Sequence, residues 1–349
     1  MVEPAPLVAP IIRDVVPRGR KGCRGKIRLE EHFAIAETLA DSGVFLPDRC
    51  WGELSRRLLD VQKERIALMD AHGMEMMILS LNAPTVQGLP DAKRAAAVAR
   101  AANDALAGEV ARRPDRFAAL AALPMQDPEL AARELERCVK ELKFCGALVN
   151  GFSQVDDVNA ALYYDTPDFW PFWETVERLD VPFYLHPRNP LPAWARIYEG
   201  HSWLLGPTWA FGVEAATHAL RLMGSGLFDR CPGLNIILGH LGEGLPYSLW
   251  RVDNRNAWAK APHRCPARKP IGEYFRANFH LTTAGNFRSQ TLIDAMLEIG
   301  ADRIMFSTDY PFEAVGDAAS WFDAAPISEG DREKIGRRNA IRLFKLGLK

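Results

Sequence analysis

Short apolar runs recur along the chain, and the stretches between them repeat apolar residues with a helical period. Runs of this length are typical of buried strands, and the amphipathic stretches are typical of helices that cover a sheet. The pattern predicts eight strands, at residues 26–29, 74–81, 117–123, 145–150, 182–186, 235–240, 279–283 and 303–307. It predicts helices at residues 54–71, 91–113, 128–142, 211–227, 290–299 and 331–346, among others.

Alternating strands and helices favour a parallel sheet, because each parallel connection needs a long crossover. Eight such strands close naturally into a (β/α)8 TIM barrel, which is the predicted fold. An open doubly wound sheet is the alternative, but no glycine-rich phosphate loop follows the first strand. Two local signals support the helix ends: Asp91 can cap the second helix, and Gly73 lies where the first should stop.

The chain has 349 residues, 48% of them hydrophobic. That length allows two domains, but barrels of this size often form one, and no linker divides residues 25–349. We therefore predict a single barrel domain there. Residues 1–24 combine prolines with arginines and are predicted to form a disordered N-terminal extension.

Composition narrows the class of partner. The formal net charge of −1 gives no electrostatic basis for binding nucleic acid or an anionic membrane. No apolar run approaches the roughly 18 residues of a membrane-spanning helix. The six cysteines have no CxxC spacing, which favours free thiols and a cytoplasmic location.

Candidate metal ligands cluster at the predicted strand ends. Glu30 and His32 are two residues apart, so a strand directs both side chains to one face. His186, His240 and Asp309 follow three other apolar runs. One such histidine alone is more often a hydrogen-bonded core residue. In a barrel, however, these strand ends converge on the face that hosts catalysis, so the joint pattern favours a divalent metal such as Zn²⁺ or Mn²⁺.

Two charged residues follow His240. Glu243 can interact favourably with the positive end of the next helix, orient His240 by a hydrogen bond, or do both. Arg251 lies about two turns further along, and its planar guanidinium suits a substrate carboxylate. The alternative is a solvated arginine on the helix surface.

Two further segments raise questions that the sequence leaves open. The long segment at residues 188–210 is rich in large aromatic residues, namely Trp194, Tyr198, Trp203 and Trp209. It can wall the mouth of the site, pack against another subunit, or do both. Arg28 shares the parity of Glu30 and would be costly inside a barrel. Either it reaches out through the lower mouth, or the alternation of the strand changes before Glu30.

Several motifs resemble the metal-dependent decarboxylase branch of the amidohydrolase superfamily, above all its γ-resorcylate (2,6-dihydroxybenzoate) decarboxylases. They are Leu-Glu-Glu-His-Phe from residue 29, Ala-Leu-Val-Asn-Gly-Phe from 147, Phe-Tyr-Leu-His-Pro-Arg-Asn-Pro from 183, Leu-Gly-Pro-Thr-Trp-Ala-Phe from 205, His-Leu-Gly-Glu-Gly-Leu-Pro-Tyr from 240 and Phe-Ser-Thr-Asp-Tyr-Pro-Phe-Glu from 306. The resemblance covers residues 26–345. Tyr310 departs from the family's tryptophan, and we expect this difference to affect the pocket.

The resemblance implies specific roles. One divalent ion would be bound by four ligands, Glu30, His32, His186 and Asp309. Asp309 would also donate the proton, and His240 and Glu243 would form a catalytic pair. The substrate would be contacted by Arg251 at its carboxylate, by Phe45 across the ring and by Asn150 near a ring hydroxyl.

The implied reaction is the reversible, non-oxidative decarboxylation of an ortho-hydroxybenzoate, above all 2,6-dihydroxybenzoate to resorcinol and CO₂. The alternatives are decarboxylation of 2,3-dihydroxybenzoate or salicylate and, less favoured, hydrolysis of an amide or lactone by metal-activated water. The resemblance also implies a homotetramer.

Overall fold

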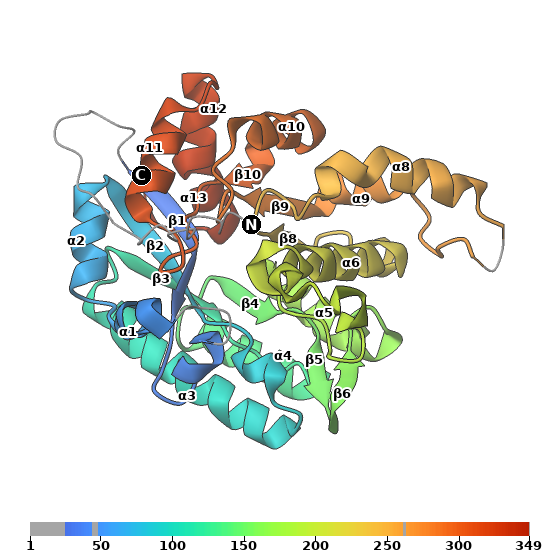
Figure 1. Cartoon of the computed structure of the whole chain (residues 1–349), viewed down its shortest axis with the longest axis horizontal. Coiled ribbons are helices and arrows are strands. Elements are labelled where there is room, and N and C mark those ends of the chain that lie inside the picture. Colours follow the sequence, from blue (N-terminus) through green and yellow to red (C-terminus); the bar gives the residue numbers. More distant parts are fainter. Residues whose placement is uncertain (1–24, 44–47, 261–262, 349) are drawn as a thin grey trace, which may run out of the picture.

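Eight parallel strands form the centre of the molecule (Figure 1). The computed structural model describes residues 25–43, 48–260 and 263–348, so the predicted extension at residues 1–24 lies outside the described residues. The strands pair in the order β1 (Lys26–Phe33), β2 (Met74–Leu81), β3 (Phe117–Ala121), β4 (Gly146–Asn150), β7 (Phe183–His186), β8 (Ile236–Leu238), β9 (Phe279–Thr282) and β10 (Ile304–Met305). A parallel bridge between Glu31 and Tyr310 joins the chain after β10 to β1. The predicted TIM barrel is confirmed.

Helices follow the strands and cover the outside of the barrel (Figure 1). They are α1 (Asp48–Leu59), α2 (Glu64–Ala71), α3 (Ala92–Arg112), α4 (Pro128–Lys140), α5 (Trp170–Leu179), α6 (Ala210–Gly224), α7 (Leu227–Arg230), α8 (Leu245–Trp258), α9 (Ile271–Asn278), α10 (Ser289–Ile299), α11 (Val315–Ala324), α12 (Glu329–Glu333) and α13 (Asn339–Phe344). Asp91 caps α3 by accepting a hydrogen bond from the backbone N–H of Arg94, as predicted.

Three predicted helices are divided in the structure. Residues 54–71 belong to α1 and α2, because the carboxylate of Asp60 accepts from the backbone N–H groups of Lys63 and Glu64 and starts a second helix. Residues 211–227 fall mainly in α6, and α7 begins at the last of them. Residues 331–346 contain α12, a π-helical turn (Lys334–Arg338) and α13.

An antiparallel hairpin of β5 (Ser153–Val155) and β6 (Asp157–Leu162) was not predicted. Its sequence is short and largely polar, so it carries little of the apolar signal on which the strand predictions rest. The helix ranges named from the sequence do not include α5, α9 and α11.

The barrel wall separates two apolar cores. The inner core contains Ile27, Leu29, Met76 and Tyr184, and it is closed from below by Ala340 and Phe344 of α13. The outer core fills the space between strands and helices. The barrel interior is therefore a packed core, and chemistry is confined to the upper strand ends.

An irregularity in β1 resolves the question of Arg28. The pairing of β1 with β2 shifts between Arg28 and Glu31, so Leu29 and Glu30 both face inward on consecutive positions. Arg28 faces the outer layer, fully buried, and donates to Thr308. The second alternative is therefore correct: the alternation changes just before Glu30.

Large aromatic side chains lie exposed in the segment 188–210 and on helix α8. In the segment 188–210, Trp194, Trp203 and Trp209 are 47%, 65% and 59% exposed, whereas Tyr198 is buried. Helix α8, which extends away from the barrel (Figure 1), adds the exposed Tyr247 and Trp250. Among the helices of the described residues, none is both long and apolar enough to cross a membrane.

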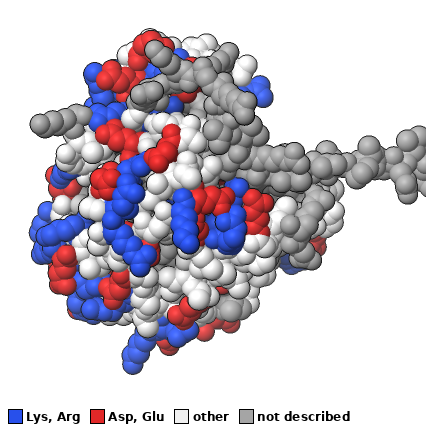
Figure 2. All heavy atoms as spheres, turned by 90° about the vertical axis from the view of Figure 1, so that its left-hand side faces the viewer, with Lys and Arg blue, Asp and Glu red and all other residues white. Residues whose placement is uncertain are grey.

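The face that carries α1 and α2 mixes both signs of charge (Figure 2). Arg57 pairs there with Glu53 and Glu64, and Arg116 pairs with Asp70. Among the described residues of this face, basic and acidic side chains are interspersed. The cysteines in the described part of the chain, Cys50, Cys138, Cys145, Cys231 and Cys265, are free thiols, as expected.

Candidate metal centre and active site

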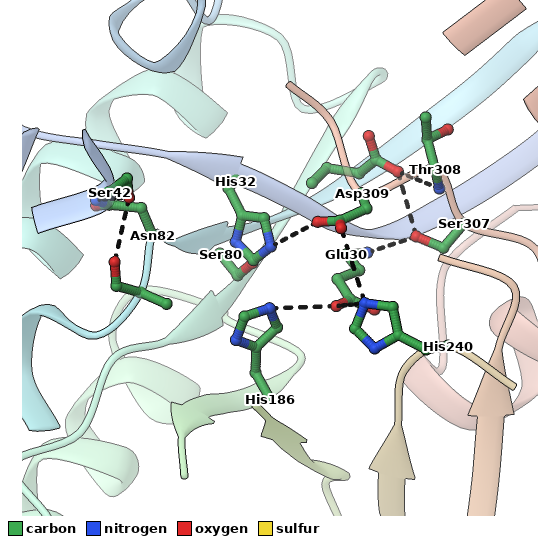
Figure 3. A network of polar contacts seen from close by, with 12 residues as sticks. Glu30, His32, Ser42, Ser80, Asn82, His186, His240, Ser307, Thr308 and Asp309 are labelled. Atoms are coloured by element: carbon green, nitrogen blue, oxygen red, sulfur yellow. Dashed lines mark hydrogen bonds and ion pairs between the residues drawn. The ribbon is translucent and has the colours of Figure 1, made fainter. Parts of the chain in front are cut away.

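Four side chains from the ends of two strands and from one loop converge above the barrel core (Figure 3). His32 Nε2 lies 3.3 Å from Asp309 Oδ1, and His186 Nε2 lies 3.3 Å from Glu30 Oε1. His240 approaches the same point, with its Nε2 3.7 Å from both Glu30 Oε1 and Asp309 Oδ2. The five residues predicted from the strand ends are therefore neighbours in space.

The donor set fits a single divalent ion. One ligand atom from each of Glu30, His32, His186 and Asp309 lies within 4.8 Å of the others. Ligand bonds of about 2.0–2.2 Å span about 4 Å across one ion, so a slight contraction would satisfy all four. Glu30 Oε1 and His32 Nε2 are buried and accept or donate no hydrogen bond within the described residues. Buried polar atoms without partners are costly, and a cation would provide the missing interaction.

Glu30 is held so that only one of its oxygens faces this centre. Its Oε2 accepts hydrogen bonds from the hydroxyls of Tyr184 and Thr282, which rise from the barrel interior. A Cβ atom at Gly239 would lie 2.8 Å from Glu30 Oε2, so only glycine leaves room for the carboxylate. This arrangement favours one-oxygen ligation through Oε1.

Asp309 occupies a strained backbone conformation. Its φ of +79° lies in the left-handed region, which non-glycine residues seldom adopt. Its N–H donates to Glu30 O at 3.1 Å, and the N–H of His32 donates to Tyr310 O at 2.7 Å. These bonds join the loop after β10 to β1 and set Asp309 opposite His32.

His240 lies two residues beyond β8, in a tight turn. His240, Leu241 and Glu243 all have positive φ, as do the two glycines between and after them. His240 Nδ1 and Glu243 Oε1 are 2.7 Å apart, which orients the ring with Nε2 toward Asp309. Glu243 therefore orients His240, one of the two roles that the sequence left open.

Charge determines the protonation of the cluster. Burial raises the pKa of Asp309, but the neighbouring His240 and His32 outweigh burial and hold that pKa well below its usual range. Burial likewise opposes ionisation of Glu30, yet His240 and His186 lower its pKa. Burial lowers the pKa of His240, but Glu243 and Glu30 outweigh it and raise that pKa well above the ordinary value. Ionised carboxylates are the form that binds a metal.

Of the three residues predicted to contact the substrate, only one lies beside the cluster in the described part of the chain. Asn150 ends β4 beside His186, is buried, and has a side-chain oxygen without a hydrogen-bond partner in the described chain. Arg251 is exposed on α8, and none of its contacts within the described residues reaches the cluster. Phe45 lies outside the described residues.

The expectation that Tyr310 affects the pocket is wrong. Its ring is fully buried in the outer layer, 4.6 Å from the guanidinium carbon of Arg65 and 6.0 Å from that of Arg57. The tyrosine ring therefore packs in the outer core, whereas the neighbouring Asp309 carboxylate belongs to the metal cluster.

The sequence reasoning missed Tyr184 and Thr282. A signal for Tyr184 was present: it is two residues before His186 on a strand and so shares its face. Thr282 ends β9, a strand that carries none of the predicted ligands.

A closed (β/α)8 barrel with a carboxylate and histidine cluster at the upper strand ends defines a class of metal-dependent enzymes. The chain belongs to the amidohydrolase family, whose model matches residues 50–346. It is 68% identical to the γ-resorcylate decarboxylase of Polaromonas sp. JS666, over 92% of this chain and 99% of that protein.

Two solved structures show the same fold. One is a dihydroxybenzoic acid decarboxylase from Polaromonas sp. JS666 with bound manganese and the inhibitor 2-nitroresorcinol; it has a TM-score of 0.91, 67% identity, and coverage of 94% of this chain and 98% of that one. The other is a 2,6-dihydroxybenzoate decarboxylase in complex with 2,6-dihydroxybenzoate; it has a TM-score of 0.91, 66% identity, and coverage of 93% of this chain and 100% of that one.

Proposed function

We propose that this chain is a metal-dependent decarboxylase that converts 2,6-dihydroxybenzoate to resorcinol and CO₂. The observation that carries the proposal is the cluster of Glu30, His32, His186 and Asp309 at the upper end of the barrel. Its support is the high identity to γ-resorcylate decarboxylases along nearly the whole described barrel. Because CO₂ release leaves the aromatic ring intact, the reaction can run in reverse at high bicarbonate.

Glu30, His32, His186 and Asp309 would hold one divalent ion. When bound, such an ion would supply a Lewis acid for the carboxylate and an ortho oxygen of the substrate. Manganese is favoured over zinc because a relative contains it and because two of the four ligands are carboxylates. Metal analysis of the purified protein, with activity restored by Mn²⁺ and by Zn²⁺ separately, tests this choice.

The protein's own groups would move two protons. The ring carbon that bears the carboxylate must gain a proton before CO₂ leaves, and Asp309 would donate it; its Oδ2 lies 3.7 Å from His240 Nε2, and Glu243 lies at the other ring nitrogen. Since Asp309 is ionised in the resting site, its proton would arrive with the substrate. His240, oriented by Glu243 and protonated in the resting site, would give a proton to the phenolic oxygen and take it back.

Hydrolysis is the competing function, since the same centre can activate water against an amide or lactone. The test is product analysis: the metal-loaded protein should release one CO₂ per resorcinol formed from 2,6-dihydroxybenzoate. Hydrolysis of amides or lactones without CO₂ release from any ortho-hydroxybenzoate would contradict the proposal.

We also propose that the chain forms a homotetramer in the cytoplasm. The exposed Trp203, Trp209, Tyr247 and Trp250 are more apolar surface than a monomer usually presents, and aromatic residues are enriched at subunit interfaces. Arg251 lies on the same helix as two of them, so such an interface would also remove it from solvent. Light scattering should give four times the chain mass, and Trp250→Glu should shift the mass downward.

A further inference from the structure

A buried ion pair lies directly behind the metal centre, on the outer side of β1. Arg28 Nη1 is 3.6 Å from Glu31 Oε2, and both side chains are fully buried. Residues three apart on a regular strand point to opposite faces. The irregularity between Arg28 and Glu31 places both on the outer face, so this pair exists because of it.

Both members of the pair bind the segment that leads to Asp309. Glu31 Oε1 accepts from the backbone N–H of Thr308 at 3.0 Å and from Ser307 Oγ at 3.3 Å. Arg28 Nη1 donates to Thr308 Oγ1 at 2.8 Å. Ser307 and Thr308 immediately precede Asp309 (Figure 3), so the pair fixes the peptide units next to it.

The same network reaches Glu30. Ser307 Oγ accepts from the backbone N–H of Glu30 at 2.9 Å, and Asp309 N–H donates to Glu30 O at 3.1 Å. One hydroxyl therefore joins the Glu31 carboxylate to the backbone of a second residue of the metal cluster. One hydrogen-bond network therefore fixes the backbone that carries both carboxylates of the centre.

The backbone of Asp309 requires such a network, because a left-handed φ is unfavourable for aspartate and persists only where the surroundings impose it. Burying a charged pair is also costly, and apolar residues of similar size would join two strands equally well. A costly pair that holds a strained residue indicates a positioning role.

We propose that Glu31, neutralised by Arg28, is a positioning residue that holds Asp309 in the conformation in which its carboxylate faces the centre. This inference rests on the proposed role of Asp309 as a metal ligand and proton donor. Glu31 itself faces away from the centre and touches neither metal nor substrate. Its effect would pass through Ser307 and Thr308.

The chain offers a matched control on the same strand. Lys26, at the lower end of β1, is buried and its Nζ lies 3.0 Å from Asp323 Oδ1. Asp323→Asn thus disturbs a partly buried ion pair of β1, at the end of the strand away from the cluster. Asp323→Asn and Glu31→Ala should both lower the melting temperature, and only Glu31→Ala should alter the centre.

The experiment is titration of the metal-depleted, folded protein with Mn²⁺, followed by electron paramagnetic resonance. Glu31→Ala should weaken Mn²⁺ binding about tenfold or more, as the loss of groups that orient ligands usually does. At saturating Mn²⁺ and substrate its kcat should fall while KM stays within twofold. Glu31→Gln, whose amide oxygen can accept the same two hydrogen bonds, should recover most of the affinity, and Asp323→Asn should bind Mn²⁺ like the wild type.

If Glu31→Ala does not fold, Ser307→Ala provides the same test without disturbing a charge, and it should weaken Mn²⁺ binding about threefold or more. Wild-type affinity in Glu31→Ala or Ser307→Ala would overturn the inference, as would an equal loss in Asp323→Asn. Failure of the proposed function would look different, because the wild-type protein itself would then bind no Mn²⁺ or release no CO₂.

Discussion

The hydroxyl of Tyr184 donates a hydrogen bond to Glu30 Oε2 from within the barrel core. Burial and the neighbouring Glu30 carboxylate raise the pKa of Tyr184 well above its ordinary value, so the phenol keeps its proton and acts as the donor. Thr282 lies 2.8 Å from the same hydroxyl and also reaches Glu30. The apolar core thus ends in two hydroxyl groups that aim a carboxylate upward.

Tyr184→Phe should weaken the binding of Mn²⁺ by about tenfold to a hundredfold, because Glu30 loses a group that orients it. Isothermal titration of the metal-depleted protein measures this change. Tyr164→Phe is the control, since Tyr164 is equally buried but bonds to Ser153, away from the centre. Equal affinity in both variants would show that Tyr184 serves only the core.

His186→Ala should remove the metal ion and the activity together. Elemental analysis should find one ion per wild-type chain and almost none in the variant. His280→Asn should keep its metal, because His280 is a buried histidine whose ring faces Asn235 and Arg303 instead of the cluster. Two ions per chain, or full activity without metal, would contradict a single-metal centre.

Arg251→Ala should lower kcat/KM for 2,6-dihydroxybenzoate by about 1.5–3 kcal/mol, as expected for a lost charged hydrogen bond. Steady-state kinetics measures this loss. Arg255→Ala is the control, since Arg255 is exposed one turn further along the same helix. An unchanged kcat/KM in Arg251→Ala would show that Arg251 is a solvated arginine on the helix surface without contact to the substrate.

The substrate assignment predicts a ranking of kcat/KM on one metal-loaded sample. 2,6-Dihydroxybenzoate should exceed 2,3-dihydroxybenzoate and salicylate, because two ortho hydroxyls activate the reacting carbon from both sides. 4-Hydroxybenzoate should be inert, because it has no ortho oxygen for chelation. A value for 2,6-dihydroxybenzoate tenfold below either rival, about 1.4 kcal/mol in the transition state, would refute the assignment.

His218 should make the fold sensitive to acid. Burial lowers the pKa of His218 from 6.5 to about 3. Below pH 6.5 the imidazole is therefore protonated in the unfolded chain, whereas in the folded chain it stays neutral down to about pH 3. Stability is therefore lost as the pH falls through this window, by up to about 1.4 kcal/mol per pH unit.

Urea unfolding at pH 7.5 and pH 4.5 measures this effect. His218→Gln, which lacks the titrating group, should lose less stability between the two pH values than the wild type. The exposed His201→Gln should behave like the wild type. Parallel losses in wild type and His218→Gln would mean that His218 is protonated within the fold.

The cluster could be predicted from the sequence because strands that are far apart in the chain end at the same face of a barrel. Once eight strands were assigned, Glu30, His186 and Asp309 had to meet at one end of the barrel. The environment of Tyr310 was not predictable in this way, because the packing of α1 and α2 against it depends on a break at Asp60 that the helical pattern does not reveal. Likewise, the local sequence of β1 gives no sign of the shift in pairing between Arg28 and Glu31, which places Glu31 behind the site.

The proposed ligands span the chain from Glu30 to Asp309, so they come from its first strand and from the loop after its last. Synthesis proceeds from the N-terminus, and a site of this kind does not exist in an unfolded or half-finished chain. Asp309 leaves the ribosome only after all eight strands have been made. Insertion of the ion is therefore a late event in the life of each molecule, and retention of metal would report that the barrel has closed.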